Sequence, residues 1–509
     1  MNKREGAQVA TMCQRGGILL TALILLVSTS SYCQWNKDVK RNNKWYFSTD
    51  PKLNIVDFTN ASSTQLPLID SSPVQSNYQY ASRSFVNDTS GNLLFYSNGG
   101  DIYDKTFSLM QNGDSITPIY PDCLTDGVLI LPQPDNDSLY YVFSVTNDTP
   151  CDMISGGKYI YYSIVNMNAN SGKGAVISKG NLIFSHNYLT LGFLKAVRHG
   201  NGRDWWLVIK NMDGNGFYRF LFTKNGIQNF PLQTIGLPFI MGDSWQAEFS
   251  PKGDKFAMIA GYGTFEHDTT SLNIYDFDRC TGLLSNAIQY PIFRVDTFLD
   301  QFAICFSPDN KMLYWSNADS IFQYDLVTHL STNVAVFDST NIDPFYVGLN
   351  MQRQFVFHYM EPGSDGRIYL GTFVNKLHYI NHPNVAGVGC DVHQNAITIP
   401  SIANCFNFNV PNYSMPPVWG SACDTLTGIS EYEIENDIGL YPNPTNDRFT
   451  IQSGGNFSDV KIYTLVSELV YEKKTKGTNN LEISTMNLSP GIYIVRIDGK
   501  YVKKLVVER

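Results

Sequence analysis

Short apolar and aromatic runs, separated by polar turns, recur along most of the chain. Six segments share one pattern: an apolar run, a polar turn, and then a strand-like run of aromatic and β-branched residues. Examples are "AEFSPKGDKFAMIAG" and "ICFSPDNKMLYWSN", and the six segments begin at Ser84, Leu129, Ala196, Ala247, Ile304 and Tyr359. Their turns end at positions 46 to 65 residues apart, with no helical periodicity between them. Such a repeat predicts four-stranded blades arranged around an axis, that is, a β-propeller.

The turns of this repeat have a local physical basis. In Ser250-Pro251 and Ser307-Pro308 the proline presets φ, and the following Asn or Gly tolerates positive φ. One blade cannot bury both of its faces, so the ring must close. Roughly 390 residues at about 55 per repeat predict seven blades. We expect the early segment Lys44–Phe58 to supply a strand to the last blade and lock the ring.

The last seventy residues contain shorter runs in which apolar and polar residues alternate. Alternation places one face of a strand in a core and the other in water. Turn residues such as Gly454-Gly455 and Ser489-Pro490-Gly491 separate the runs. The pattern predicts a small antiparallel β-sandwich of six short strands, at Asp447–Ile451, Asp459–Leu465, Leu469–Lys473, Asn480–Ser484, Gly491–Asp498 and Lys503–Glu508.

This tail resembles the type A C-terminal sorting domain of proteins exported by the type IX secretion system of Bacteroidetes. The resemblance rests on Pro442, Asn443 and Pro444, then Gly491 and Tyr493, and finally Lys503 and Lys504, which occur in the order typical of that domain. It implies Sec export followed by passage through the type IX machinery, which would be a partner of the chain. The protein is then expected in the medium or at the outer-membrane surface.

The N-terminus agrees with export. Ile18–Val27 is an apolar run of signal-peptide length that follows Lys3, Arg4 and Arg15, and it is too short to span a bilayer. Cleavage is expected before Gln34, and either Met1 or Met12 can be the initiator. Tyr32 disfavours the alternative in which Cys33 is lipidated, because that signal needs a small residue there. No other stretch of the sequence is suited to a transmembrane span.

These features divide the chain into four expected parts. They are a signal peptide at 1–33, a seven-bladed propeller at 34–425, a linker at 426–437 and the sorting domain at 438–509.

When the repeats are considered together with the signal peptide and the tail, the chain from about residue 44 onward resembles a group of Bacteroidetes secreted β-propeller proteins. The matching segments are Trp45–Phe47, Val56–Phe58, Gly91–Gly99, Asp104-Lys105 and Met110–Gly113. The resemblance implies a secreted propeller with no established enzymatic activity.

Composition narrows the possible partners. The chain has 509 residues, of which 13% are aromatic and 16% charged, and its formal net charge is −9. The many aromatic residues suit half-buried strands. The negative charge argues against a nucleic-acid partner, because phosphate binding needs a basic face.

Motifs that could carry chemistry are few. "NMDGNG" at Asn211–Gly216 matches the first half of a calcium loop, but position twelve is Phe222, so we interpret it as a hairpin turn. His378 and His382 have a metal-ligand spacing on a helix, yet their segment is strand-like. Trp205 and Trp206 are expected in the core rather than in a sugar platform. The sequence therefore assigns no catalytic, cofactor-binding or metal-binding residue.

Seven cysteines lie beyond the expected signal peptide, so at least one is free or paired between chains. We expect disulfides Cys123–Cys151 and Cys390–Cys405, with Cys280–Cys305 as a weaker candidate because Cys305 lies in an expected strand.

Two functions remain open from the sequence. The first is a surface binding or adhesion module that is not an enzyme, whose ligand is an unknown surface protein or glycan. The alternative is a secreted hydrolase or lyase of polysaccharide with its site in the propeller channel. Convergence of carboxylates, arginines or histidines in that channel would favour the enzyme.

Deleting the residues after Asp437 tests the export prediction. We expect the truncated protein to accumulate in the periplasm, because the sorting signal is gone while the Sec signal remains. Fractionation with immunoblotting of periplasm, surface and medium measures this. Surface or medium levels equal to those of the full chain would contradict the sorting role.

Overall fold

The computed structural model describes most of the chain outside the N-terminal 37 residues and several internal segments. The described ranges are 38–47, 53–72, 83–118, 126–148, 157–189, 194–211, 214–238, 244–262, 269–292, 303–317, 319–338, 357–372, 375–400, 408–423, 438–464, 469–498 and 501–508.

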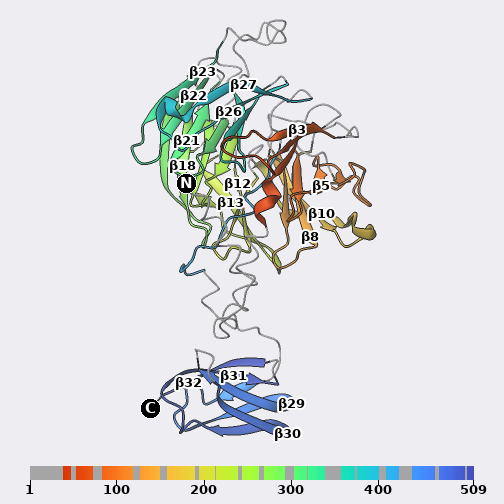
Figure 1. Cartoon of the computed structure of the whole chain (residues 1–509), viewed down its shortest axis with the longest axis vertical. Helices are drawn as coiled ribbons and strands as arrows, with labels where there is room; N and C mark the ends of the chain where they lie inside the picture. The colour runs from red at the N-terminus through yellow and green to blue at the C-terminus, as the bar shows by residue number, and fades with distance from the viewer. Residues whose placement is uncertain are drawn as a thin grey trace. The chain divides into compact units, whose positions relative to one another are not determined.

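Each of the six repeat segments forms the first hairpin of an antiparallel sheet (Figure 1). Numbered along the chain, the second sheet consists of β4 (Ser84–Asn87), β5 (Leu93–Ser97) and β6 (Ile102–Asp104). The third consists of β7 (Val128–Pro132), β8 (Leu139–Thr146), β9 (Gly157–Asn166) and β10 (Ala175–Leu189). The fourth is β11 (Lys195–Arg198), β12 (Trp205–Lys210), β13 (Gly216–Thr223), β14 (Gly226–Asn229) and β15 (Gln233–Thr234).

The next three sheets continue this order along the chain. The fifth is β16 (Ser244–Phe249), β17 (Lys255–Tyr262), β18 (Thr269–Phe277) and β19 (Leu284–Ile292). The sixth is β20 (Ala303–Phe306), β21 (Met312–Ser316), β22 (Ser320–Asp325) and β23 (Ser331–Val336), and the seventh is β24 (His358–Pro362), β25 (Ile368–Gly371), β26 (Lys376–Ile380) and β27 (Val392–Thr398). Short 3-10 helices are η1 (Asp38–Asn42), η2 (Asn170–Gly172) and η4 (Gly387–Cys390).

The early segment forms a sheet of its own, which differs from the expectation that it completes the last blade. β1 (Lys44–Phe47), β2 (Asn54–Asp57) and β3 (Leu68–Ser71) pair in order and make the first sheet. Lys44–Phe58 is thus another inner hairpin of the same kind as the six repeats. The described residues contain seven sheets between Lys44 and Thr398, while seven blades as the count for the whole chain stays a prediction.

Burial falls from the first strand of a sheet to its last. β7 and β20 are buried at every position, whereas the last strands β19 and β23 are mostly exposed. First strands lie between two neighbouring sheets and bury both faces, so they carry nearly continuous apolar runs. This gradient is the one expected of blades whose first strands surround a central axis.

Side-chain packing links the seven sheets in a closed cycle. One cluster joins the second, third and fourth sheets through residues such as Phe95, Phe143 and Trp205. Three further clusters join the fourth to the fifth, the fifth to the sixth and the sixth to the seventh. A last cluster packs Tyr369 of the seventh sheet against Trp45 of the first. The same cluster includes Phe85 of the second sheet, so the ring is closed.

Arg367 reinforces this closure with backbone hydrogen bonds. Its guanidinium donates to the carbonyl oxygens of Ser62 and Ser63, both at 2.8 Å, which belong to the first sheet's β2–β3 turn. It also forms an ion pair with Asp365 at 2.6 Å, and both side chains are buried. One side chain of the seventh sheet therefore holds a turn about 300 residues earlier in the sequence.

The end of the propeller segment returns to the inner strands. Phe408 forms a parallel bridge with Arg83 beside β4, and we call residues 408–415 the channel segment. The Tyr413 hydroxyl donates to the backbone oxygen of Ile130 in β7 at 2.8 Å. A disulfide between Cys280 and Cys423 fixes the chain just beyond this segment to the turn after β18.

This disulfide replaces the expected Cys280–Cys305 pair. Cys305 is a free thiol buried in β20, where it packs as a small apolar residue. Cys390 is also a free, buried thiol, which does not support its expected bond to Cys405. Cys123, Cys151 and Cys405 lie outside the described residues, so Cys123–Cys151 stays a prediction.

The tail forms a second antiparallel module. Its strands are β28 (Gly439–Tyr441), β29 (Arg448–Thr464), β30 (Leu469–Ser484), β31 (Gly491–Ile497) and β32 (Tyr501–Val507). The first four expected runs merge into two long strands, β29 and β30, because their pairing continues through bulges near Phe457. The first half of β29 pairs with β28 and the second half with β31, around a core that includes Phe449, Ile462 and Val495.

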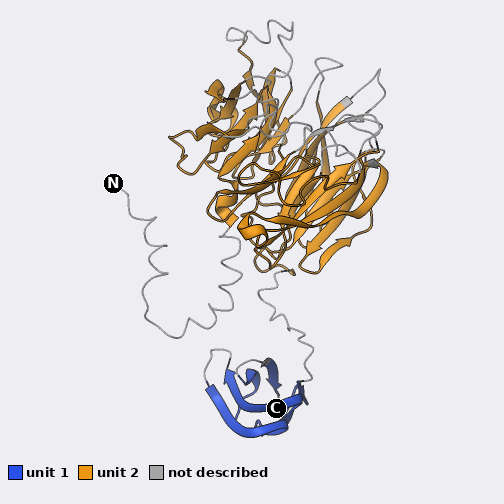
Figure 2. Cartoon of the chain, turned by 90° about the vertical axis from the view of Figure 1, so that its right-hand side faces the viewer, with its two compact units in different colours: residues 1–32, 428–509 blue, residues 33–427 orange. Residues whose placement is uncertain are grey.

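The chain divides into two compact units, residues 33–427 and a unit that contains residues 428–509 (Figure 2). The expected linker, 426–437, lies outside the described residues, and the finer domain boundaries remain a proposal. None of the helices in the described ranges is long and apolar enough to cross a membrane.

Replacing Arg367 tests the ring closure. We expect Arg367→Met to lower the free energy of unfolding by about 3 kcal/mol or more, because it leaves buried Asp365 without its cation and frees the 62–65 turn. Denaturant titration of the full chain measures this. Lys311→Met is the control, since Lys311 is 69% exposed in its pair with Asp309 and should cost less than about 1 kcal/mol. Equal losses in both variants would contradict the closing role.

Candidate functional site: a pocket at the inner strands

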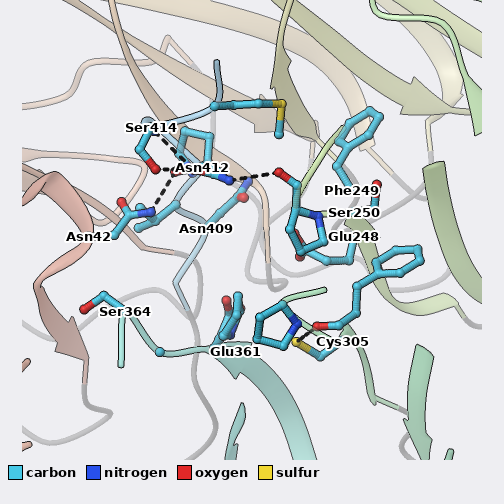
Figure 3. A pocket seen from close by; sticks show the side chains of 18 of the residues that line it. Asn42, Glu248, Phe249, Ser250, Cys305, Glu361, Ser364, Asn409, Asn412 and Ser414 are labelled. Carbon is cyan, nitrogen blue, oxygen red and sulfur yellow. Dashed lines mark hydrogen bonds between the residues drawn. The ribbon is translucent and has the colours of Figure 1, made fainter. Parts of the chain in front are cut away.

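A cavity of about 350 Å³ lies where the first strands of several sheets meet the channel segment (Figure 3). Four successive sheets each contribute one polar side chain from their first strand: Lys195 from β11, Glu248 from β16, Cys305 from β20 and Glu361 from β24. Pockets that hold small ligands commonly begin at about this size. The repeat thus places residues that are 53 to 57 positions apart around one cavity.

Buried hydrogen bonds fix the strands that carry these side chains. Gln246 in β16 donates from Nε2 to the Met360 carbonyl oxygen at 2.8 Å, and its Oε1 accepts the backbone N–H groups of Ile304 and Met360. One buried amide therefore ties β16, β20 and β24 together. The spacing of Glu248, Cys305 and Glu361 follows from this tie.

The channel segment forms the facing wall. Asn409 Nδ2 donates to the backbone oxygen of Leu194 at 2.7 Å and to that of Asp126 at 3.3 Å. Asn412 donates to the Pro251 oxygen at 3.4 Å, and Asn42 of η1 donates to the Pro411 oxygen at 3.5 Å (Figure 3). These bonds hold the segment against β11 and the turn after β16, so the pocket depends on residues from both ends of the propeller.

Two carboxyl groups share one ammonium at this site, those of Asp126 and Glu248. Lys195 Nζ lies 2.9 Å from Asp126 Oδ2 and 3.5 Å from Glu248 Oε2. Asp126 and Lys195 are buried, and the Glu248 side chain is 23% exposed. Burial alone would lower the pKa of Lys195, but the neighbouring carboxylates raise it, so Lys195 stays charged.

Glu361 is the carboxyl group without a partner. It is 9% exposed, and within the described part of the chain its carboxylate makes no hydrogen bond or ion pair. Burial raises the pKa of Glu361 well above its ordinary value, and the neighbouring Glu248 raises it further. Burial also raises the pKa of Glu248, although Lys195 opposes that effect. Glu361 is therefore the group that holds a proton most readily, a state suited to donating to a ligand or an acid–base step.

The remaining lining mixes aromatic residues and prolines with small polar residues. Trp45, Phe249, Phe306 and Phe408 line the cavity together with prolines of the turns. Burial raises the pKa of the Cys305 thiol well above its ordinary value, which leaves it a poor nucleophile. A few polar groups within an aromatic wall is the usual make-up of a ligand pocket.

The motifs considered from the sequence lie elsewhere and act structurally. Lys210 and Phe217 pair at the end of β12 and start of β13, and Asn211 bonds to Gly216, which confirms the hairpin. His378 accepts the Asn395 N–H, while His382 bonds to Asn381, so the two do not share a site. Across the described ranges no group of three or more His, Cys, Asp or Glu residues is placed to hold a metal ion.

The two tryptophans are core residues, as expected. Trp205 and Trp206 are at most 1% exposed. The Arg198 guanidinium lies 4.0 Å from the Trp205 ring centroid, and Trp206 Nε1 donates to the Arg279 oxygen at 2.9 Å.

The sorting-motif residues come together in the tail. Asn443, between Pro442 and Pro444, donates from Nδ2 to the Lys504 oxygen at 2.7 Å and accepts the Val506 N–H at 2.8 Å. The register of β31 and β32 pairs Gly491 with Val507, Tyr493 with Leu505, and Val495 with Lys503. The Tyr493 hydroxyl donates to the Ser489 oxygen at 2.8 Å. The motif thus joins the β28–β29 connection to the last strand.

Sequence reasoning missed Asp126, Lys195, Glu248 and Glu361, although the repeat held a signal. The second residue of "AEFSP" is Glu248, the second residue of "ICFSP" is Cys305, and the third residue of "YMEPG" is Glu361. Each stands just before the Phe or Pro that leads into the turn. A carboxylate in an otherwise apolar inner strand is costly and therefore informative. That these positions face one cavity follows only from the closed ring.

Comparison with known proteins identifies the tail. Residues 439–508 match the secretion system C-terminal sorting domain family. The protein is therefore exported by the type IX route to the cell surface or the extracellular space, in agreement with the prediction from the sequence.

A 95-residue stretch of the chain is 41% identical to an ulvan lyase of Nonlabens ulvanivorans. The match covers 18% of this chain, and the chain spans 17% of the lyase's length. The expectation that the protein is not an enzyme is contradicted by this similarity to a polysaccharide lyase. That expectation rested on the absence of a linear catalytic motif, and carboxyl groups gathered from three separate segments leave no such motif.

Solved structures resemble the chain only in outline. The Dos1 propeller is 12% identical, covers 71% of this chain and 82% of its own, and has a TM-score of 0.40. Hydrazine synthase of Kuenenia stuttgartiensis is 11% identical, covers 65% and 90%, and has a TM-score of 0.39. The all-β propeller fold therefore rests on the protein's own sheets and their cyclic packing.

Replacing Glu361 tests its protonation. An unfolded Glu loses its proton above about pH 4.3, whereas folded Glu361 keeps it to higher pH because its pKa is raised. The folded chain then binds more protons, so Glu361 lowers stability as pH rises between those two pKa values, by at most about 1.4 kcal/mol per pH unit.

We expect Glu361→Gln to remove this loss. The variant should gain stability over the natural chain as pH rises from about 4.5 toward neutrality, measured by denaturant unfolding at several pH values. Glu482→Gln in the tail is the control, since its side chain is 58% exposed. A stability difference that does not change with pH would contradict a protonated Glu361.

Proposed function

We propose that this secreted propeller binds a glycan of a surface or extracellular polymer through the pocket at its inner strands. The observation that carries the proposal is Glu361, a buried carboxyl group without a partner that lines a 350 Å³ cavity. Burial of a carboxyl group without a partner costs stability, as the raised pKa of Glu361 reflects. A ligand that bonds to it recovers this cost, which favours occupancy.

The lining suits a sugar. Hydroxyl groups of a sugar can bond to the carboxyl groups of Glu248 and Glu361, while the prolines of the lining contact its apolar faces. Export to the surface by the type IX route places the pocket where extracellular polysaccharides occur.

Blocking the pocket tests this proposal. Ser364 is exposed at the pocket rim in the β24–β25 turn, and Ser90 is exposed in the equivalent β4–β5 turn, outside the pocket. We expect Ser364→Trp to weaken binding of a polysaccharide on a glycan array at least tenfold, while Ser90→Trp leaves it unchanged. Titration calorimetry with the full chain measures the affinity. Equal binding by both variants would place the ligand elsewhere.

Cleavage of the bound polysaccharide is the second candidate, favoured by one observation. Glu361 and Glu248 are neighbouring acids in different surroundings, since Glu248 is close to Lys195 and Glu361 has no partner. Such a pair can divide the roles of acid and base in hydrolase or lyase chemistry. We expect incubation of the bound polysaccharide with the full chain, followed by chromatography, to show products that Glu361→Gln abolishes.

A further inference from the structure

The pocket combines an excess of negative charge with an aromatic wall. Asp126, Glu248 and Glu361 supply three carboxyl groups, and Lys195 supplies the one ammonium group near them. The Cys305 thiol is the other titratable group lining the cavity, and it is neutral because burial raises its pKa. Ionised together, these groups would leave two uncompensated negative charges in a largely enclosed space.

Lys195 cannot remove this imbalance. Its ammonium is already engaged by Asp126 at 2.9 Å and by Glu248 at 3.5 Å, and it forms no hydrogen bond or ion pair with Glu361. The described part of the chain offers Glu361 no cation at hydrogen-bonding distance. The position beside Glu361 is therefore one where an added cation would gain a full charge-assisted hydrogen bond.

The aromatic residues favour the same kind of group. Phe249 and Glu361 both line the cavity (Figure 3), and so do Trp45, Phe306 and Phe408; these four aromatic residues are at most 7% exposed. The negative face of an aromatic ring attracts a cation, and desolvation in a pocket strengthens the attraction. Aromatic residues beside a carboxylate are a common way to bind an ammonium group.

We propose that the pocket selects a sugar that carries a free, protonated amine, with the amine bound by the Glu361 carboxylate. This inference rests on the proposed glycan binding and adds the charge of the ligand. Acidic sugars are disfavoured, because their carboxylate would meet Glu248 and Glu361 without a free partner cation.

Binding of such an amine changes the protonation of the site. The cation stabilises ionised Glu361 and lowers its pKa, so the carboxyl group releases its proton when the amine binds. Affinity should therefore rise with pH until Glu361 is ionised in the free protein or the amine itself loses its proton. A neutral sugar does not produce this dependence.

Three sugars of similar size test the inference with the full chain. D-glucosamine, D-glucose and D-glucuronate differ mainly in charge, and titration calorimetry measures their affinities in buffers of different ionisation enthalpy. We expect glucosamine to bind at least tenfold more tightly than glucose, with proton release, and glucuronate to bind most weakly. Glu361→Gln should remove the preference for glucosamine, while Glu482→Gln keeps it.

The outcomes separate this inference from the proposed function. Glucose bound as tightly as glucosamine, with both lost in Ser364→Trp, would overturn the amine preference and support glycan binding in the pocket. Glucosamine preferred equally by the natural chain and Glu361→Gln would overturn the role of Glu361. No binding of any of the three sugars would overturn the inference, and no polysaccharide binding on the array would overturn the proposed function.

Discussion

The packing of the first sheet between the seventh and the second is the constraint on which the propeller depends. Inner strands such as β4, β11 and β20 bury both faces, so a sheet without a neighbour would expose an apolar surface. Trp45 and Phe58 fill that gap against Tyr369 in edge-to-face contacts, and Arg367 anchors the turn beside them. Residues more than 300 positions apart thus complete one core, and the hydrophobic effect closes the ring.

Ring closure also creates the site. Inner strands that pack around an axis leave space at the centre, and the channel segment fills part of it while Cys280–Cys423 holds the chain beyond it. Asn409 bonds to backbone atoms at Asp126 and Leu194, next to the Lys195 ion pair. The architecture that buries the core therefore fixes the carboxyl groups, and it holds them before any ligand arrives.

The carboxyl groups in the pocket lower the stability of the fold. A buried carboxyl group without a partner is costly, and an apolar residue at position 361 would pack without that cost. Other buried charges make direct bonds, as Asp38 does with Arg41 and Arg198 and as Arg279 does with backbone oxygens. Glu361 makes no such bond among the described residues, which is why we place the proposed function at the pocket.

The sequence by itself determined the strands, their turns, the repeat and the sorting tail. Periodicity and turn residues act over a few neighbours, so segments such as Ala247–Gly261 and Gly491–Ile497 form strands wherever they lie. Only the tertiary structure decided that Lys44–Phe58 opens its own sheet, that Cys280 pairs with Cys423, and that Glu248 and Glu361 share a cavity. Those outcomes depend on which distant segments the closed ring brings together, and no local pattern carries that information.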